Sequence, residues 1–293
     1  MSSQALAHTA AEGFKDAAAY DAHRPAYPAE AVQRLLEHMR LADRAHARVV
    51  EVAAGTGKFT EALAARHEGF EVVAVEPHPD MRKGLGAKGL RGVSVRDGSA
   101  EDMAGVAGVR DGWGEGCVAA QSFHWFATNE ALAEIHRVLQ PGAVFGMIWN
   151  IDDYNKPKSW AARTSWAQHL NDWILTLASD DAHPFRELQW QEVFSKQLKS
   201  NPVQVLCDTL TNNLPQFSLP IGQDSVEWTH WLGEEALWKR INTLSQVAML
   251  EGEERAKAEG VFREAMAMAD VVRNERGEVE CHGRTYLAWT DVM

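Results

Sequence analysis

The chain has 293 residues, of which 45% are hydrophobic and 24% are charged, and its formal net charge is −12. This length is near the upper limit for one hydrophobic core, so we expect a single domain with an inserted lid. The acidic balance argues against a nucleic-acid substrate, because binding to a phosphate backbone needs a basic face. No apolar run is long enough to cross a bilayer, and the first nine residues do not resemble a signal peptide. A cytoplasmic protein that binds no membrane is therefore predicted.

Two local patterns are expected to be structural. One pattern is a basic run over residues 82–96 that contains no acid. Its basic residues are Arg82, Lys83, Lys88, Arg91 and Arg96. At this net charge they are interpreted as a solvated helix and loop. The three cysteines, Cys117, Cys207 and Cys281, are far apart and odd in number, so their spacing indicates neither a disulfide framework nor a zinc site.

In chain order, a mobile N-terminal segment of residues 1–18 precedes a region in which strands and helices alternate, up to residue 150. The expected helices are Ala29–Arg40, Lys58–Arg66, Asp80–Gly86 and Asn129–Leu139. The expected strands are Arg48–Val52, Glu71–Val75, Val93–Asp97, Gly116–Ala120 and Ala143–Trp149. Such alternation predicts an α/β fold, with a parallel sheet that has helices on both faces.

Beyond Asn150 the pattern becomes mainly helical, which suggests a lid made from residues 151–293. An apolar stripe predicts a helix over residues 159–178, and two more helices are expected at Glu235–Met249 and Glu253–Val272. Strand-like segments lie near Val203–Leu210 and Thr285–Thr290. Eight of the eleven tryptophans lie in this part, and most of them are expected to pack the lid.

The most informative stretch runs from Val49 to Thr60. A β-branched run that contains Glu51 leads into the turn Gly55-Thr56-Gly57, and a helix follows. Glycines in such a turn let the backbone approach a small ligand closely. Thr60 occupies the place of the third glycine of a dinucleotide fingerprint, so a pyrophosphate ligand is not expected.

Acidic residues follow the next two predicted strands. Glu76 ends the second strand about 20 residues past the glycine turn, where a carboxylate can accept hydrogen bonds from ribose hydroxyls. The segment Asp97-Gly98-Ser99-Ala100-Glu101-Asp102 follows the third strand, at a place where an adenine ring could lie. Three successive strand ends therefore present ligand-binding groups along one edge of the predicted sheet.

With these motifs, and with the segments 20–28, 120–126 and 139–143, the chain resembles the class I S-adenosylmethionine-dependent methyltransferases. Within that class it is similar to the "type 11" small-molecule group, which includes the fungal trans-aconitate and cantharidin methyltransferases. The chain departs from the family pattern at Ala54, where many relatives carry glycine. The resemblance implies a Rossmann-like, mostly parallel seven-stranded sheet with a helical lid. It also implies that Val203–Leu210 and Thr285–Thr290 form its antiparallel edge.

The same resemblance implies that S-adenosylmethionine is the cofactor and assigns residues to its site. Those expected to bind the cofactor are Tyr20, Arg24, Glu51, Ala53, Gly55, Gly57, Glu76, Pro77, Asp97, Gly98, Ser99, Ala100, Gln121 and Ser122. Those expected to bind the methyl acceptor are Tyr27, Phe123, His124, Trp125, Trp149 and Asn150.

His124 is the candidate catalytic residue, because an imidazole can remove a proton from a hydroxyl or thiol acceptor. The alternatives are that it only positions ligands, or that the acceptor is a carboxylate, which needs no base. Asp152 and Asp153 could bind a metal, but no third ligand can be identified, so solvated loop acids are favoured and no metal is expected.

The predicted activity is methyl transfer from S-adenosylmethionine to an oxygen of a small acid or secondary metabolite, by a monomer or homodimer. A sulfur or nitrogen acceptor is the main alternative. A protein that binds S-adenosylmethionine without transferring its methyl group, either regulatory or pericyclase-like, would have the same cofactor site. A nicotinamide oxidoreductase is disfavoured by the missing third glycine.

Overall fold

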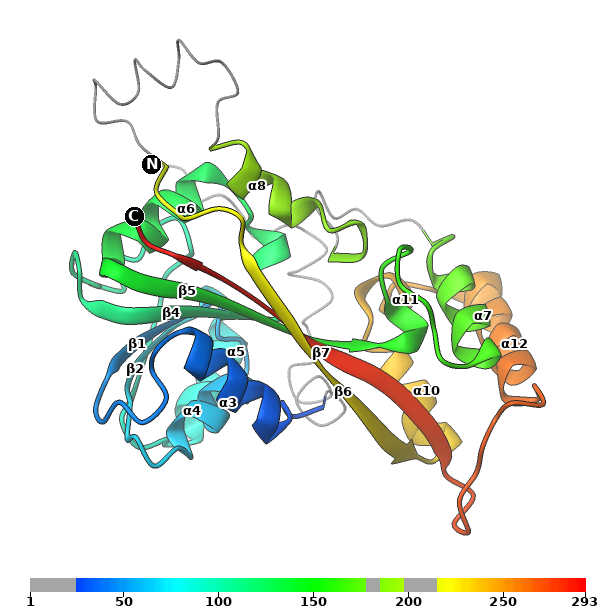
Figure 1. Cartoon of the computed structure of the whole chain (residues 1–293). Helices are drawn as coiled ribbons and strands as arrows, with labels where there is room; N and C mark the ends of the chain where they lie inside the picture. The colour runs from blue at the N-terminus through cyan, green and yellow to red at the C-terminus, as the bar shows by residue number, and fades with distance from the viewer. Residues whose placement is uncertain (1–24, 178–184, 198–214) are drawn as a thin grey trace. The chain divides into compact units, whose positions relative to one another are not determined.

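The computed structural model of the chain describes residues 25–177, 185–197 and 215–293, which contain one seven-stranded sheet (Figure 1). Its strands are β1 (Arg48–Val52), β2 (Glu71–Val75), β3 (Val93–Arg96), β4 (Gly114–Ala120), β5 (Leu139–Asp152), β6 (Gly222–Leu232) and β7 (Val279–Asp291). Their order across the sheet is β3-β2-β1-β4-β5-β7-β6. The predicted Rossmann-like fold with seven strands is therefore confirmed.

The first five strands are parallel, and their register is continuous through β1. Val50 lies opposite Val73 of β2 on one side and opposite Cys117 of β4 on the other. The valines of β1 and β2 are buried, as expected for parallel strands whose two faces are both covered. The chain order reverses between β1 and β4, and ligands bind at such a switch point beyond the carboxyl ends of the strands.

Helix α3 (Ala29–His38) precedes β1. Three helices connect parallel strands close to the predicted boundaries: α4 (Lys58–Ala64), α5 (Pro79–Ala87) and α6 (Asn129–Val138). The Thr128 side chain accepts a hydrogen bond from the backbone N–H of Ala131 and so caps α6. β5 begins directly after α6 and runs through Pro141-Gly142, so these two residues lie inside the strand.

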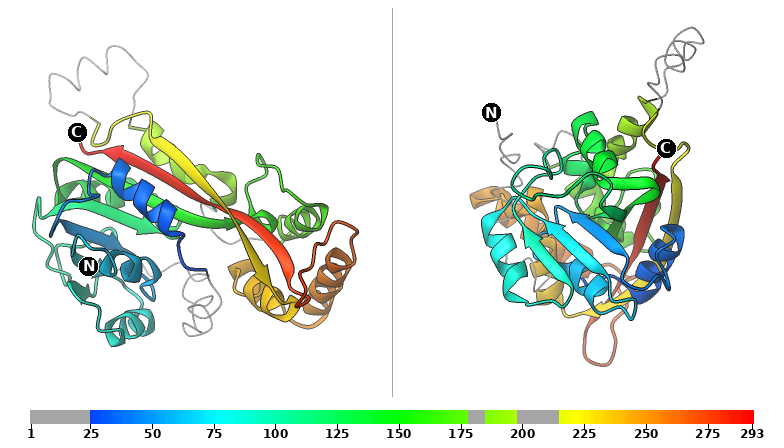
Figure 2. Two further views of the ribbon diagram at one scale, coloured as in Figure 1. Left: turned by 60° about the horizontal axis from the view of Figure 1, so that its bottom comes forward. Right: turned by 90° about the vertical axis from the view of Figure 1, so that its left-hand side faces the viewer.

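β6 and β7 complete the sheet and lie side by side in both views of Figure 2. β7 runs opposite to β5 and β6, and Phe217 pairs with Val292 in the antiparallel sense. The outermost strand is Gly222–Leu232, a segment in which no strand is predicted. The segment Val203–Leu210, which the resemblance places at this edge, lies outside the described residues. The prediction at Thr285–Thr290 is confirmed, since it lies within β7.

The chain divides into two compact units. One consists of residues 27–149, 189–224 and 286–293, and the other of residues 1–26, 150–188 and 225–285. The first unit contains β1–β4 and the helices between them.

The second unit is mostly helical and has its own apolar core. Its helices are α7 (Ser165–Ile174), α10 (Glu234–Ile241), α11 (Ser245–Ala248) and α12 (Gly252–Met266). Trp166 and Trp173 are buried in this core, as expected from the apolar stripe. The single helix expected at Glu235–Met249 is interrupted after Ile241. There the side chains of Asn242 and Thr243 donate to the carbonyls of Trp238 and Arg240, and such local bonds compete with helix continuation.

The described residues bear on the expected absence of membrane spans and on the expected state of the cysteines. Within them, no helix combines the length and the apolar character that a membrane crossing requires. Cys117 and Cys281 are both buried as free thiols, and Cys207 lies outside the described part of the chain.

Candidate functional site

The turn between β1 and α4 is tightly folded. Three residues in it have positive φ values, namely Ala53 (+52°), Gly55 (+59°) and Gly57 (+85°). A Cβ atom on Gly57 would lie 2.2 Å from Cδ1 of the buried Leu85, so another residue there would combine backbone strain with a displaced Leu85 side chain. The alanine with the glycine-like backbone is Ala53, one position before Ala54.

Glu76 connects this turn to the end of β2. Its Oε2 accepts a hydrogen bond of 2.8 Å from the backbone N–H of Gly55, and its Oε1 accepts one of 2.7 Å from that of His78. The side chain is buried, and burial raises the pKa of Glu76 although both backbone donors act to lower it. The carboxylate therefore fixes the glycine turn. Each of its oxygens keeps a lone pair for another donor.

Glu51 lies on the neighbouring strand, and its side chain is fully buried. Neither of its side-chain oxygens has a hydrogen-bond partner among the described residues. The hydroxyl of Thr60 has none there either, but it lies close enough to Glu51 to lower the pKa of that carboxyl. Burial dominates and raises that pKa to about 8. Because a buried polar group without a partner is costly, these two oxygens are candidates for binding a cationic or hydrogen-bond-donating ligand group.

Arg82 joins the ends of β2 and β3, a role that the sequence does not reveal. Its guanidinium donates to the carbonyls of Glu76 and Pro77 and forms a two-point ion pair with Asp97, at 3.1 and 3.2 Å. Arg96, another member of the basic run, donates to the carbonyl of Ala107 at 2.7 Å. These two residues therefore hold loops in place, which corrects the interpretation of the run as only solvated.

The loop after β3 packs closely against β2. A Cβ atom on Gly98 would lie 3.0 Å from Cγ1 of Val75 and from Cβ of Ala107. Ala100 is buried, and Ser99 forms an isolated bridge with Asp102. Asp97 is half exposed and is held by Arg82. The loop thus places Asp97 and several small residues beside the end of β2.

A short 3-10 helix, η1 (Phe123–Trp125), follows β4. Gln121 precedes it with a φ of +58°, and the Oγ of the buried Ser122 has no hydrogen-bond partner among the described residues. In η1, the rings of His124 and Trp125 are 5.1 Å apart. Nδ1 of His124 accepts a hydrogen bond of 3.2 Å from Nε1 of the Trp149 indole.

Phe123 lies in an environment different from that of its neighbours in η1. Its side chain is fully buried, and its ring contacts four others, those of Phe126, Phe145, Trp190 and Phe194. These contacts anchor η1 to the core of the first unit.

Asn150 ends the predicted core region, and it forms hydrogen bonds within the second unit. Its amide nitrogen donates to the carbonyls of Pro25 and Ala26, and its Oδ1 accepts a hydrogen bond of 2.6 Å from Thr285. Asn150 therefore holds the chain just before Tyr27, whose ring packs edge-on against that of Phe59. Tyr20 and Arg24, both expected at the cofactor, lie outside the described residues.

Asp152 and Asp153 are not solvated loop acids, because both are buried. Asp152 lies 2.8 Å from a guanidinium nitrogen of the buried Arg240, and Asp153 pairs with Arg163 at 3.1 Å. Asp152, the last residue of β5, and Asp153, which follows it, are thus each compensated by an arginine.

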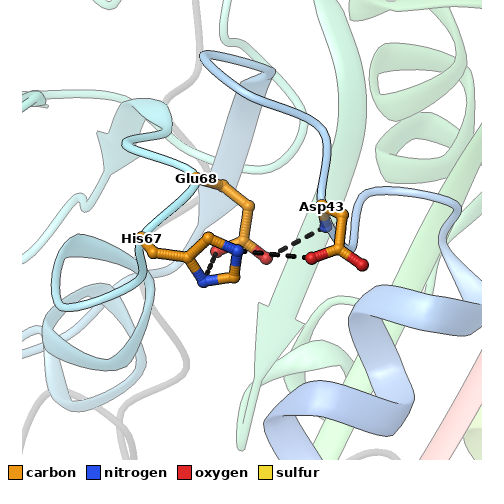
Figure 3. A group of neighbouring side chains, drawn as sticks. All are labelled: Asp43, His67 and Glu68. Atoms are coloured by element: carbon orange, nitrogen blue, oxygen red, sulfur yellow. Dashed lines mark hydrogen bonds and ion pairs between the residues drawn. The ribbon is translucent and has the colours of Figure 1, made fainter.

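Asp43, His67 and Glu68 form a cluster of possible metal ligands in the first unit (Figure 3). The Arg66 guanidinium contacts both oxygens of Glu68, at 2.6 and 2.9 Å, and lowers the pKa of that carboxyl to about 2. The backbone N–H of Asp43 donates to Glu68 as well. Because an arginine already neutralises the only buried member, we interpret the cluster as an ion-pair network.

Comparisons with known proteins agree with this architecture. Residues 50–147 match the family described as "Methyltransferase domain". The chain is 29% identical over 259 residues to "Uncharacterized methyltransferase Rv3342" of Mycobacterium tuberculosis, which covers 88% of this chain and 87% of that protein. It is 34% identical over 179 residues to "Uncharacterized methyltransferase-like C25B8.10" of Schizosaccharomyces pombe. That alignment covers 61% of this chain and 63% of the relative.

Solved structures show the same fold. A "putative Type II Methyltransferase" from Anaeromyxobacter dehalogenans superposes with a TM-score of 0.52 at 19% identity, covering 91% of this chain and 97% of that one. The strand order and the glycine turn, together with the match to the methyltransferase domain, define the class of protein. This chain is a class I S-adenosylmethionine-dependent methyltransferase.

Proposed function

We propose that this enzyme transfers a methyl group from S-adenosylmethionine to an oxygen of a small organic acid or secondary metabolite. The observation that carries the proposal is the pair of buried carboxylates, Glu51 and Glu76, on either side of the glycine turn at the ends of adjacent parallel strands. Oxygen is favoured over sulfur or nitrogen because of the resemblance to the small-molecule group. Identification of the methylated product by mass spectrometry distinguishes these acceptors.

The side chains at the strand ends suit the cofactor. Glu76 has lone pairs left after binding two backbone N–H groups, so it can accept hydrogen bonds from ribose hydroxyls. The two unpartnered oxygens of Glu51 suit the positively charged methionine portion. Gly55 and Gly57 let the backbone approach it, and Gln121 and Ser122 would lie beside it. Asp97, Ser99 and Ala100 would border the adenine.

The tasks of the protein follow from the chemistry that the cofactor brings. When bound, S-adenosylmethionine supplies an activated methyl group on a positively charged sulfur. The protein then has to align the acceptor and exclude water. Trp125 offers rigid apolar surface for the acceptor, and His124, held by the buried Trp149, offers a polar group next to it.

The first test is the affinity of a Glu76→Ala variant. Loss of the two charge-assisted hydrogen bonds to the ribose should weaken binding of S-adenosylmethionine by about 2–4 kcal/mol, measured by titration calorimetry. Glu71→Ala, at the exposed start of the same strand, is the matched control and should leave the dissociation constant unchanged. Equal affinity in Glu76→Ala and wild type would refute the assignment. Circular dichroism shows whether the variant retains its fold.

A further inference from the structure

The hydrogen bond between Trp149 and His124 restricts what His124 can do. Trp149 is buried on β5, and its ring packs 4.8 Å from that of Trp190 and 6.0 Å from that of Tyr286. The indole is therefore held in place, and its Nε1–H points at Nδ1 of His124 at 3.2 Å. An indole N–H can only donate, so Nδ1 has to be the acceptor.

This donor fixes the tautomer of the His124 ring. A neutral imidazole carries one N–H group, so a ring that accepts at Nδ1 carries its proton on Nε2. A protonated ring would place a second N–H against the indole N–H, and the hydrogen bond would be lost. A general base has to direct an unprotonated nitrogen at the proton that it removes. In His124 that nitrogen faces Trp149.

We propose that His124 is a hydrogen-bond donor to the methyl acceptor and not its base, and that the acceptor oxygen is a carboxylate. This inference rests on the proposed function. A new C–O bond forms between a carboxylate oxygen and the methyl carbon, and the C–S bond breaks with its electron pair left on sulfur. The products are a neutral ester and a neutral thioether, so no proton has to be removed. The Nε2–H group holds the second carboxylate oxygen.

The alternative acceptor, a neutral hydroxyl, fits this arrangement less well. Methylation of a neutral hydroxyl gives an oxygen that still carries its proton, and this proton has to be transferred to a base. The lone pair of His124 that could take it is already occupied by the Trp149 indole. A carboxylate is ionised at neutral pH without help from the protein.

The tautomer can be measured without cofactor or acceptor. In protein labelled with ¹⁵N-histidine, long-range ¹H–¹⁵N spectra distinguish protonated from unprotonated ring nitrogens, and loss of signals in His124→Gln identifies His124 among the 12 histidines. We expect a neutral ring protonated at Nε2 at pH 7.5 in the wild type, and a mixed population in Trp149→Phe. A ring protonated at Nδ1, or a charged ring, would overturn the proposal even if the enzyme binds S-adenosylmethionine as expected.

The second measurement compares two substitutions at His124. Glutamine keeps an N–H donor but has no basicity, whereas alanine removes both. With a carboxylic acid acceptor we expect kcat/KM of His124→Gln to stay within about tenfold of the wild type, and His124→Ala to fall well below it. A loss of 10²-fold or more in kcat for both variants is the result expected of a general base and would contradict the proposal. Turnover of alcohols but not of carboxylates would contradict it equally, whereas absence of S-adenosylmethionine binding in the wild type would instead refute the proposed function.

Discussion

Ala53 has a backbone conformation that glycine adopts without strain and that an L-residue with a Cβ does not. Its φ is +52°, at the carboxyl end of β1, within the turn that contacts Glu76. The left-handed conformation costs a residue other than glycine about 1–2 kcal/mol. Strain of this kind is found at ligand sites, where the surrounding structure holds the backbone in place. Gln121, at the end of the neighbouring β4, has a φ of +58°.

Relief of this strain gives a prediction about stability. Ala53→Gly should raise the free energy of unfolding by about 0.5–1 kcal/mol, because the relieved strain exceeds the entropy that glycine adds to the unfolded chain. Ala54→Gly is the matched control, since Ala54 has no positive φ and is buried, so it should lower stability by a similar amount. Urea denaturation of both variants measures the difference. If the two substitutions have effects of the same sign, the strain at Ala53 is refuted.

Glu51 makes stability depend on pH. Burial raises its pKa from 4.5 to about 8, so between these values the folded protein holds a proton that the unfolded chain has lost. The contribution of Glu51 to the free energy of unfolding therefore falls as pH rises through this window, and above pH 8 the buried carboxylate is fully destabilising.

Glu51→Gln removes this dependence, because the amide stays neutral. The variant should resemble the wild type at pH 5 and be more stable at pH 8.5 by about 2–4 kcal/mol. Glu71→Gln, on an exposed side chain, should follow the wild type at both pH values. Urea denaturation at the two pH values provides the measurement, and a constant difference between Glu51→Gln and wild type would contradict the prediction.

At the scale of elements, a buried ion pair connects the end of β5 to α10. Asp152 and Arg240 have side chains only 7% and 6% exposed, with 2.8 Å between their charged atoms, and the Arg240 guanidinium lies 5.6 Å from the centre of the Trp228 ring. Removal of one partner leaves an uncompensated charge inside the protein. Removal of both leaves an apolar contact, which is often no less stable.

A double-mutant cycle tests this connection. Arg240→Met should lower the free energy of unfolding by about 3–5 kcal/mol, because the Asp152 carboxylate stays buried without its cation. The double variant Asp152→Leu with Arg240→Met should recover most of that loss. Thermal or urea denaturation of the four proteins measures the coupling. Additive losses would show that the two side chains contribute independently, contrary to the observed pairing.

The elements also differ in how far their sequences predict them. β1 and β2 are predicted to the residue, because each is a run of valines buried on both faces. β6 is missed because it is an edge strand. It contains Asp224, Glu227 and His230, and only Val226 and Trp228 are buried, so no apolar run is visible.

The same distinction holds for the site. Glu51, Glu76 and the glycine turn are recognisable because one local pattern contains the chemistry and its placement. The bond from Trp149 to His124 joins residues 25 positions apart, and that from Thr285 to Asn150 joins residues 135 apart. Contacts of this kind depend on which strands become neighbours and not on any spacing within a motif.

At the scale of the whole molecule, the formal net charge is −12, and members of the one local basic run, residues 82–96, contact acids or backbone carbonyls. Arg82 is paired with Asp97, Lys88 lies 3.2 Å from Glu61, and Arg96 donates to a backbone carbonyl. Acids thus neutralise two of the five basic residues, Arg82 and Lys88, and attraction to a phosphate backbone depends on many unpaired cations.

We therefore expect no binding of duplex DNA or RNA. In fluorescence anisotropy at 0.05 M salt, where non-specific electrostatic binding is strongest, a labelled duplex should show no saturable change up to about 100 μM protein. A variant with Glu61→Gln and Asp97→Asn releases Lys88 and Arg82 and reduces the negative charge by two. It should still not bind, because the long-range field stays negative. Salt-sensitive binding by the variant alone would show that local pairing, and not net charge, keeps this surface from nucleic acid, and binding by the wild type would contradict both arguments.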